Sequence, residues 1–195
     1  MSTTVALSQR LKTETADAHE RMHRLMADHA PFASRARYAR FVSAQYLFQR
    51  DVEHLFADPA VQAAVPDLSV RGRAEASLAD LADLETPAPP AADIATAGVA
   101  MPEALGWIYV SEGSTLGAAF LLKEVGEKLG LDADFGARNL AAYPEGRMRV
   151  WKRFVEALDA EALRAVQQPV LEGAHAAFRR FAQLLAAEFA RDTTA

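Results

Sequence analysis

Residues 107–120, WIYVSEGSTLGAAF, belong to a long segment with the apolar spacing of an α-helix, yet the segment carries glycines in its interior. Glycine inside a helix costs about 1 kcal/mol relative to alanine, so its presence needs a reason. Gly106, Gly113 and Gly117 fall on one face, where no side chain stands above the backbone. We expect that face to admit a flat group at close range, and the Gly113–Ser114 pair to allow a kink. Close packing of two helices on small residues is the alternative.

The rest of the chain also has helical patterning and almost no strand signal, because alanine and leucine dominate and apolar residues recur three and four apart. We expect helices over roughly 5–28, 34–56, 70–85, 102–129, 148–158 and 161–191, the last broken or kinked near Pro169, with loop or short turns at 131–146. Ser34 is a candidate N-cap, and the prolines of 86–90 must end the third helix. The sequence therefore predicts one all-α domain over residues 1–195.

Composition excludes several classes of function. Apolar residues make up 51% and charged residues 24% of the 195 residues, which excludes a disordered chain. The net charge of −5 argues against a general nucleic-acid binder. The absence of cysteine excludes disulfides, zinc-thiolate sites, iron–sulfur clusters, thiolate-ligated haem and cysteine nucleophiles. The first residues lack a signal-peptide core and no uncharged segment reaches about 18 residues, so we expect a cytoplasmic protein that contacts no membrane.

Five polar residues interrupt the apolar faces of the first two predicted helices. Lys12 and His19 share one side of the first helix, about 10.5 Å apart along its axis, and His23 lies one turn further. Gln45 and Gln49 project from the middle of the second helix. Burying an unpaired amide costs about 1–3 kcal/mol, so each glutamine needs a partner, a water or a polar pocket. The alternatives are surface histidines, a metal ion shared by the two histidines, and core glutamines with satisfied hydrogen bonds.

These features fit one picture, in which a flat ligand lies between the first helix and the glycines of the fourth. His19 would approach the face of the ligand, and Lys12 would meet anionic groups at its edge. Haem has this form: an apolar plate, a central iron that accepts imidazole, and two propionates at one edge.

At this point the sequence resembles the haem oxygenases, especially the bacterial iron-acquisition type, over nearly the whole chain. The stretch LKTETADAHER, residues 11–21, is similar to the proximal helix of that family, and YVSEGS with LGAA, residues 109–114 and 116–119, is similar to its flexible distal helix. Further similar segments are PFAS at 31–34, the run 38–49, and FGAR at 135–138. The resemblance implies a haem-oxygenase-like helical bundle.

The resemblance also implies roles for individual residues. His19 matches the proximal iron ligand of haem b, and His23 stands where the family usually has a carboxylate. Contacts with haem are implied for Lys12, Thr15 and Tyr109, of which Lys12 and Tyr109 match propionate contacts, for Phe178 and Phe181, and for Gly113, Ser114 and Gly117 on the distal side. The distal hydrogen-bond and water network is implied to include Gln45, Gln49, Arg73 and Trp151.

The chemistry implied by the resemblance is O₂-dependent opening of haem to biliverdin, CO and Fe²⁺. Since the chain has no dinucleotide fingerprint, electrons must come from a separate ferredoxin, flavodoxin or NADPH-dependent reductase. Lys12 and Tyr109 match members that open the α-meso position, while Glu124 stands where another branch carries a lysine, so we expect biliverdin IXα from a monomeric enzyme. The alternatives are a non-catalytic haem carrier or sensor on the same fold, a cofactor-free helical enzyme like the thiamin-degrading proteins, and a helical interaction module.

Overall fold

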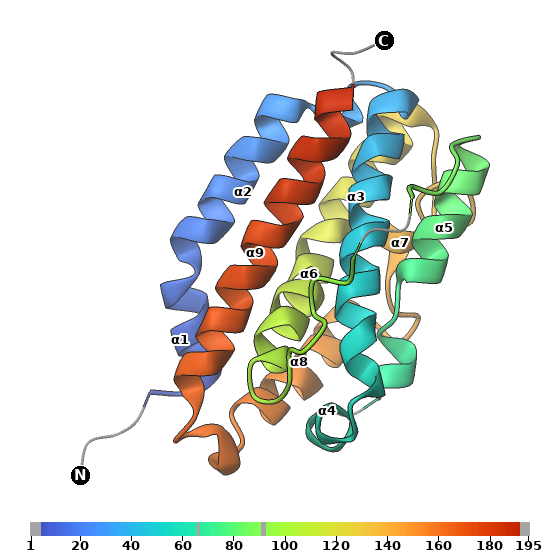
Figure 1. Ribbon diagram of the computed structural model, residues 1–195. Coiled ribbons are helices and arrows are strands. Elements are labelled where there is room, and N and C mark those ends of the chain that lie inside the picture. The colour runs from blue at the N-terminus through green and yellow to red at the C-terminus, as the bar shows by residue number, and fades with distance from the viewer. Residues whose placement is uncertain (1–4, 66, 91–92, 192–195) are drawn as a thin grey trace.

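Long amphipathic helices account for most of the computed structural model, which describes residues 5–65, 67–90 and 93–191 (Figure 1). The remaining residues of the predicted domain, including the start of the segment tested for a signal peptide, lie outside the described ones. The described residues form nine α-helices: α1 Leu7–Glu14, α2 Ala16–His29, α3 Arg35–His54, α4 Pro59–Ala64, α5 Ala74–Asp83, α6 Ala104–Leu129, α7 Arg138–Ala141, α8 Arg147–Leu158 and α9 Gln167–Ala190. Short 3₁₀ turns occur at Pro31–Ala33, Leu55–Ala57, Leu68–Val70 and Glu161–Leu163. The predicted all-α class is confirmed.

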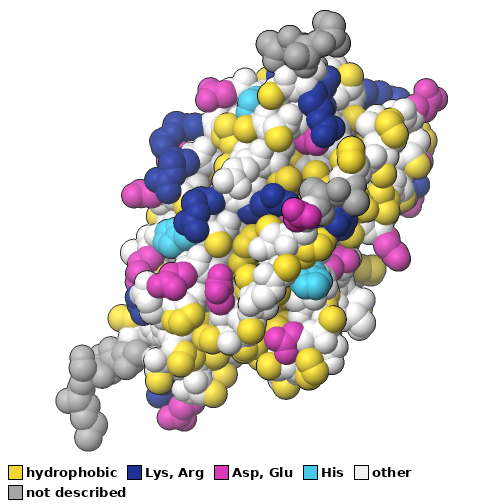
Figure 2. All heavy atoms as spheres, viewed as in Figure 1, with side chains coloured by type: hydrophobic (Ala, Val, Ile, Leu, Met, Phe, Trp, Pro, Cys, Tyr) yellow, Lys and Arg dark blue, Asp and Glu magenta, His cyan; other side chains and the backbone are white. Residues whose placement is uncertain are grey.

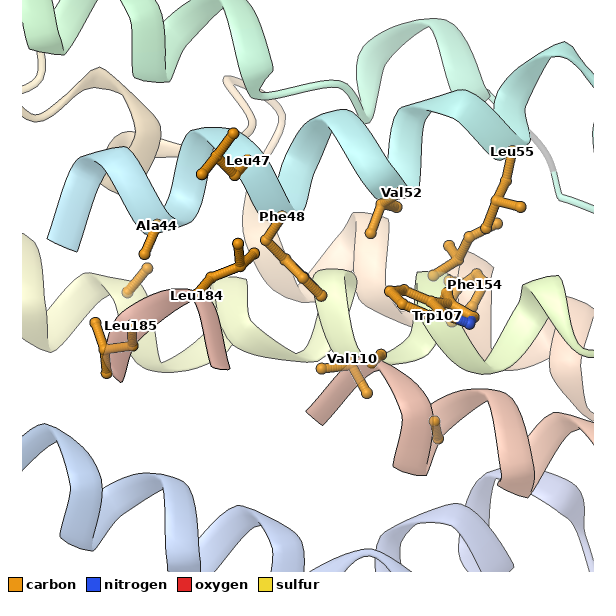
Figure 3. Packing of buried hydrophobic residues seen from close by; sticks show 14 of the residues in the cluster. Ala44, Leu47, Phe48, Val52, Leu55, Trp107, Val110, Phe154, Leu184 and Leu185 are labelled. Carbon is orange, nitrogen blue, oxygen red and sulfur yellow. The ribbon is translucent and has the colours of Figure 1, made fainter. Parts of the chain in front are cut away.

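The helices form a bundle in which α9 lies between α2 and α3, with α6 behind them (Figure 1). The core is built where α3, α6, α8 and α9 meet, and Figure 3 shows their apolar side chains turned toward one another. The rings of Phe48 on α3 and Trp107 on α6 stack with centroids 6.3 Å apart. This core fixes α3, α6 and α9 relative to one another, whereas α1 and α2 lie along one flank.

The predicted first helix is wrong in one respect, because it is two helices that meet at Thr15. Thr15 leaves the helical conformation with φ −100° and ψ 4°, and its hydroxyl donates a hydrogen bond to the carbonyl of Leu11. A threonine hydroxyl that bonds back one turn competes with the backbone and bends a helix. The chain on this flank of the bundle is therefore divided into α1 and α2 at Thr15.

The other boundaries differ less, each for a local reason. Helix α5 begins at Ala74, four residues later than predicted, because a carboxylate oxygen of Glu53 accepts the backbone N–H groups of Arg73 and Ala74 at distances of 2.6 and 2.7 Å. The break in the C-terminal segment falls before Gln167, and Pro169 lies in the first turn of α9, where its missing N–H costs no hydrogen bond. The short helices α4 and α7 were not predicted.

Gly106, Gly113 and Gly117 of α6 do not serve one purpose, which corrects the expectation that these three form one ligand face. A Cβ atom at Gly106 would lie 2.0 Å from the carbonyl oxygen of Val170 in α9, so Gly106 permits close helix packing. Gly113 and Gly117 have no such neighbour. The packing explanation is therefore correct for Gly106 alone, because α6 and α9 converge at that end.

Figure 2 shows acidic and basic side chains on one face of the molecule, scattered among many hydrophobic and uncharged ones. Within the ranges described above, no helix is long and apolar enough to cross a membrane.

Candidate functional site

A large cavity lies between the α1–α2 flank and the bundle formed by α3, α6 and α9. Its volume is about 1230 Å³, above the roughly 300–1,000 Å³ of most ligand pockets. Two of the predicted site residues, Gln49 and Gly106, do not line this cavity, whereas the following ones do: Lys12, Thr15, His19, Gln45, Arg73, Tyr109, Gly113, Ser114, Gly117, Trp151, Phe178 and Phe181. The fold thus brings together residues that are up to 169 positions apart in the sequence, namely Lys12 and Phe181.

An imidazole is available on the α2 wall of the cavity. The ring centroid of His19 lies 4.5 Å from that of His23 and 6.4 Å from that of Phe178, which it meets edge to face. Burial and the neighbouring His23 lower the pKa of His19, against the opposing charge of Glu20. A lowered pKa favours the neutral imidazole, which is the form that binds metals. No group of three or more possible ligand side chains occurs in the described part of the chain, so this wall can offer a single axial ligand but no closed metal site.

The α6 wall of the cavity exposes backbone at Gly113 and Gly117. Among the described residues, a Cβ atom at Gly113 would meet only Trp151, at 3.8 Å, and one at Gly117 would meet nothing within 4 Å. The Ser114 hydroxyl turns back to donate to the carbonyl of Ser111 at 2.7 Å. A flat molecule can therefore approach this part of α6 without meeting a bulky side chain.

Aromatic rings from α3 and α9 close the apolar side of the cavity. Phe181 contacts Phe48 and Phe41 edge to face, with centroids 5.5 and 6.4 Å apart. Phe178 lies one turn earlier on α9 and faces His19. Such rings suit a large apolar ligand, because burial of aromatic surface is strongly favourable.

One edge of the cavity is polar. Lys12 lines this edge and is exposed. Tyr109 also lines the cavity, and burial raises the pKa of its hydroxyl, although a side-chain hydrogen bond with Thr15 acts in the opposite direction. Tyr109 also packs on Trp151, with ring centroids 5.6 Å apart. This edge offers a cation and a protonated phenol to an anionic ligand group.

A polar group of a different kind lies on the inner wall. The buried Arg73 donates from one guanidinium nitrogen to the Ser111 carbonyl at 2.9 Å and its hydroxyl at 2.8 Å, and from another to the Tyr143 hydroxyl at 3.1 Å. Gln49 is only 1% exposed and does not line the cavity. Its side-chain carbonyl accepts from the Ser111 hydroxyl at 3.2 Å, while its amide nitrogen has no hydrogen-bond partner among the described residues. Gln45, one turn earlier, reaches the cavity itself.

Several residues in and behind the cavity lining were not predicted from the sequence. Tyr143, Glu112 and Arg71 connect to Arg73 from behind, and Asn139 and Met22 line the cavity directly. Glu112 could have been found, because a carboxylate inside an apolar helix needs a buried partner. Arg71 and Tyr143 carry no local signal, since only the tertiary fold brings them to α6.

Comparisons with known proteins give a consistent result. The family model described as "Heme oxygenase" matches residues 5–187. The chain is 46% identical, over 185 residues, to "Heme oxygenase PigA" of Pseudomonas aeruginosa, with 94% of this chain and 93% of that protein covered.

Two solved structures share the fold. The crystal structures of the NO- and CO-bound heme oxygenase from Neisseria meningitidis match with a TM-score of 0.85 and 32% identity, covering 95% of this chain and 93% of that one. The heme oxygenase from Leptospira interrogans matches with a TM-score of 0.69 over 94% of this chain and 100% of that one, and its 15% identity supports the fold alone. The chain therefore belongs to the haem oxygenase family and is an enzyme of that family.

Proposed function

We propose that this chain binds haem b in the cavity, with His19 as the axial iron ligand, and opens the ring with O₂ to give biliverdin, CO and Fe²⁺. The observation that carries the proposal is that one apolar cavity is lined by His19 on α2 and by the bare backbone of Gly113 and Gly117 on α6. The residues fit the group, because haem needs an imidazole, an open face for a small gas and apolar walls.

When bound, haem supplies the iron chemistry, and the protein supplies orientation, protons and exclusion of water. His19, on the α2 wall, would hold the iron in its neutral form, which its lowered pKa favours. His23 adjoins the His19 ring in place of a carboxylate, so the ligand receives less electron density than a carboxylate partner would give. Gly113 and Gly117 would leave room for O₂ beside the bound haem, and Arg73 and Gln45, which line the inner wall, would hold water there.

The orientation of haem would be set at the polar edge. Lys12 and Tyr109 would hold the two propionates there, which directs oxidation to the α-meso carbon and gives biliverdin IXα. A second cation at the cavity, Lys128, is already paired with Glu124 through an oxygen 2.6 Å away. Because Glu124 neutralises Lys128 and repels an anion, this part of the cavity disfavours binding of the propionates.

Electrons would come from a separate ferredoxin, flavodoxin or NADPH-dependent reductase, and the enzyme would act as a monomer of one domain in the cytoplasm. Release of iron from haem would be one purpose of the reaction.

Incubation of the purified protein with haem, O₂ and a reducing system tests the proposal. Enzymatic opening predicts loss of the haem absorption, a green pigment that extracts as biliverdin, and one CO per haem. A haem carrier or sensor on the same fold would bind haem with the same stoichiometry and leave the ring intact after many minutes with reductant.

A further inference from the structure

Directly behind the cavity wall, a cluster of charged and polar side chains is almost completely buried. We call it the Arg73 cluster; it comprises Arg71, Arg73, Ser111, Glu112 and Tyr143. The exposed fractions are 1% for Arg71 and Glu112, 2% for Ser111, 6% for Arg73 and 7% for Tyr143. Of these residues, Arg73 reaches the cavity, and the others lie behind it.

Tyr143 joins the two charged halves of the cluster. Its hydroxyl donates to the carboxylate of Glu112, whose oxygens lie 2.7 and 2.8 Å away, and accepts from Arg73 at 3.1 Å. Burial raises the pKa of Tyr143, so the phenol keeps the proton that it donates. The backbone of Tyr143 belongs to the segment between α7 and α8, so this contact ties a loop to the cavity wall.

The carboxylate of Glu112 contacts both arginines. One carboxylate oxygen lies 2.5 Å from a guanidinium nitrogen of Arg71, and the other lies 3.6 Å from Arg73. Asp67 gives Arg71 a second partner at 2.8 Å. A buried charge without a partner is strongly destabilising, so each side chain in this cluster has one favoured position in which its charge is paired. The guanidinium of Arg73 is therefore also held in one position.

Arg73 is therefore fixed at both ends. Its backbone N–H donates to Glu53 at 2.6 Å, and its guanidinium is held by Ser111 and Tyr143. A catalytic site gains from a donor whose orientation is set before the substrate arrives, because no reorganisation is then needed during the reaction.

We propose that Tyr143 and Glu112 are positioning residues of this enzyme, which act by holding the guanidinium of Arg73 in one orientation at the cavity wall. The inference rests on the proposed binding of haem in this cavity. It assigns a function to a buried loop tyrosine that touches no substrate. Tyr143→Phe removes one hydroxyl and leaves the packed ring in place, so it tests the hydrogen bonds of that hydroxyl with Arg73 and Glu112 alone.

Azide binding to the ferric haem complex tests the positioning, because azide is a small anion that a guanidinium at the wall attracts. Absorption titrations would give the azide dissociation constant for the unmodified protein, Tyr143→Phe, Arg73→Ala and the double variant, beside the haem affinity and the rate of biliverdin formation. We expect Tyr143→Phe to weaken azide binding and to slow biliverdin formation about tenfold each, with haem affinity changed less than about twofold. The double variant should equal Arg73→Ala, since residues that act through one another are not additive.

Tyr46→Phe is the matched control, because it removes a hydroxyl from a half-buried tyrosine that is outside the cavity and should change none of these values. Glu112→Gln is the second variant should Tyr143→Phe fail to fold, and it must show the same non-additivity with Arg73→Ala. Unchanged azide binding in Tyr143→Phe or in Arg73→Ala, or effects of Tyr143→Phe and Arg73→Ala that multiply in the double variant, would overturn the proposal. Azide binding is measured without turnover. If the protein bound haem but made no biliverdin, that result would refute the proposed function, yet the azide titration would still test the positioning of Arg73.

Discussion

Gly106 of α6 and Gly173 of α9 lie back to back, so closely that neither position has room for a Cβ atom. A Cβ built on Gly106 would lie 2.8 Å from the carbonyl carbon of Gly173, and one built on Gly173 would lie 2.2 Å from the carbonyl oxygen of Glu103. The two backbones are therefore in direct contact at this end of the bundle. Gly117, three turns along α6, has open space instead, so the same residue type has opposite purposes within one helix.

Replacement of Gly106 by alanine and replacement of Gly117 by alanine should consequently have opposite effects on the stability of the protein. Gly106→Ala forces α6 away from α9 and should destabilise the haem-free protein by about 3 kcal/mol. Gly117→Ala meets nothing and should stabilise it by up to about 1 kcal/mol through helix propensity. Denaturant unfolding of the two variants and the unmodified protein gives both numbers. Equal effects would mean that Gly106 is not a packing residue.

Larger side chains at the open glycines should separate haem binding from haem opening. Gly113→Leu or Gly117→Leu places a side chain where O₂ must reach the ring, so each variant should retain haem but lose biliverdin formation. The measurement is haem titration followed by extraction of pigment after reduction. Biliverdin formation at the normal rate in both variants would show that the α6 wall does not cover the reacting face.

The polar edge of the cavity predicts which isomer forms. The unmodified protein should give biliverdin IXα, and joint replacement of Lys12 by Ala and Tyr109 by Phe should give a mixture. The energy that holds one orientation is small, since exposed charge pairs contribute roughly 0–1 kcal/mol each. Chromatography of the extracted pigment identifies the isomers. A predominance of the β or δ isomer from the unmodified protein would mean that other residues hold the propionates.

Lys123→Ala is a suitable control for that experiment. This exposed lysine is also on α6, lies outside the cavity lining and pairs with Glu127 at 3.7 Å on the surface. Its removal changes the net charge by the same amount as removal of Lys12. The isomer ratio should not change.

The sequence predicted the long helices well, because their apolar spacing is a local property. Ser34 does cap α3, with its hydroxyl oxygen accepting the N–H of Arg37 at 3.2 Å. The break at Thr15 was missed because a threonine hydroxyl can form a hydrogen bond either with water or with a backbone carbonyl one turn earlier. The sequence does not distinguish the two. The late start of α5 was missed too, because it depends on Glu53, about twenty positions earlier in the chain.

The residues that line the cavity were largely predictable, yet their connections were not. Glycines and glutamines within apolar helices stand out in a sequence, and most of these reach the cavity. Gln49 and Gly106 are the exceptions, since Gln49 packs behind the wall against Ser111 and Gly106 packs against α9. Of the Arg73 cluster, only Arg73 itself was predicted, through the family resemblance. Arg71 and Tyr143 were missed because they come from segments that meet α6 only after folding.

The iron ligand is tested most directly by the absorption and resonance Raman spectra of the haem complex for the unmodified protein, His19→Ala and His23→Ala. His19 as the ligand predicts that His19→Ala loses the iron–imidazole band and regains it when imidazole is added. His23→Ala, the matched control four residues along α2, should retain the band with a shifted frequency, because the two rings lie 4.5 Å apart. Loss of the band in His23→Ala, with its retention in His19→Ala, would contradict the assignment of His19.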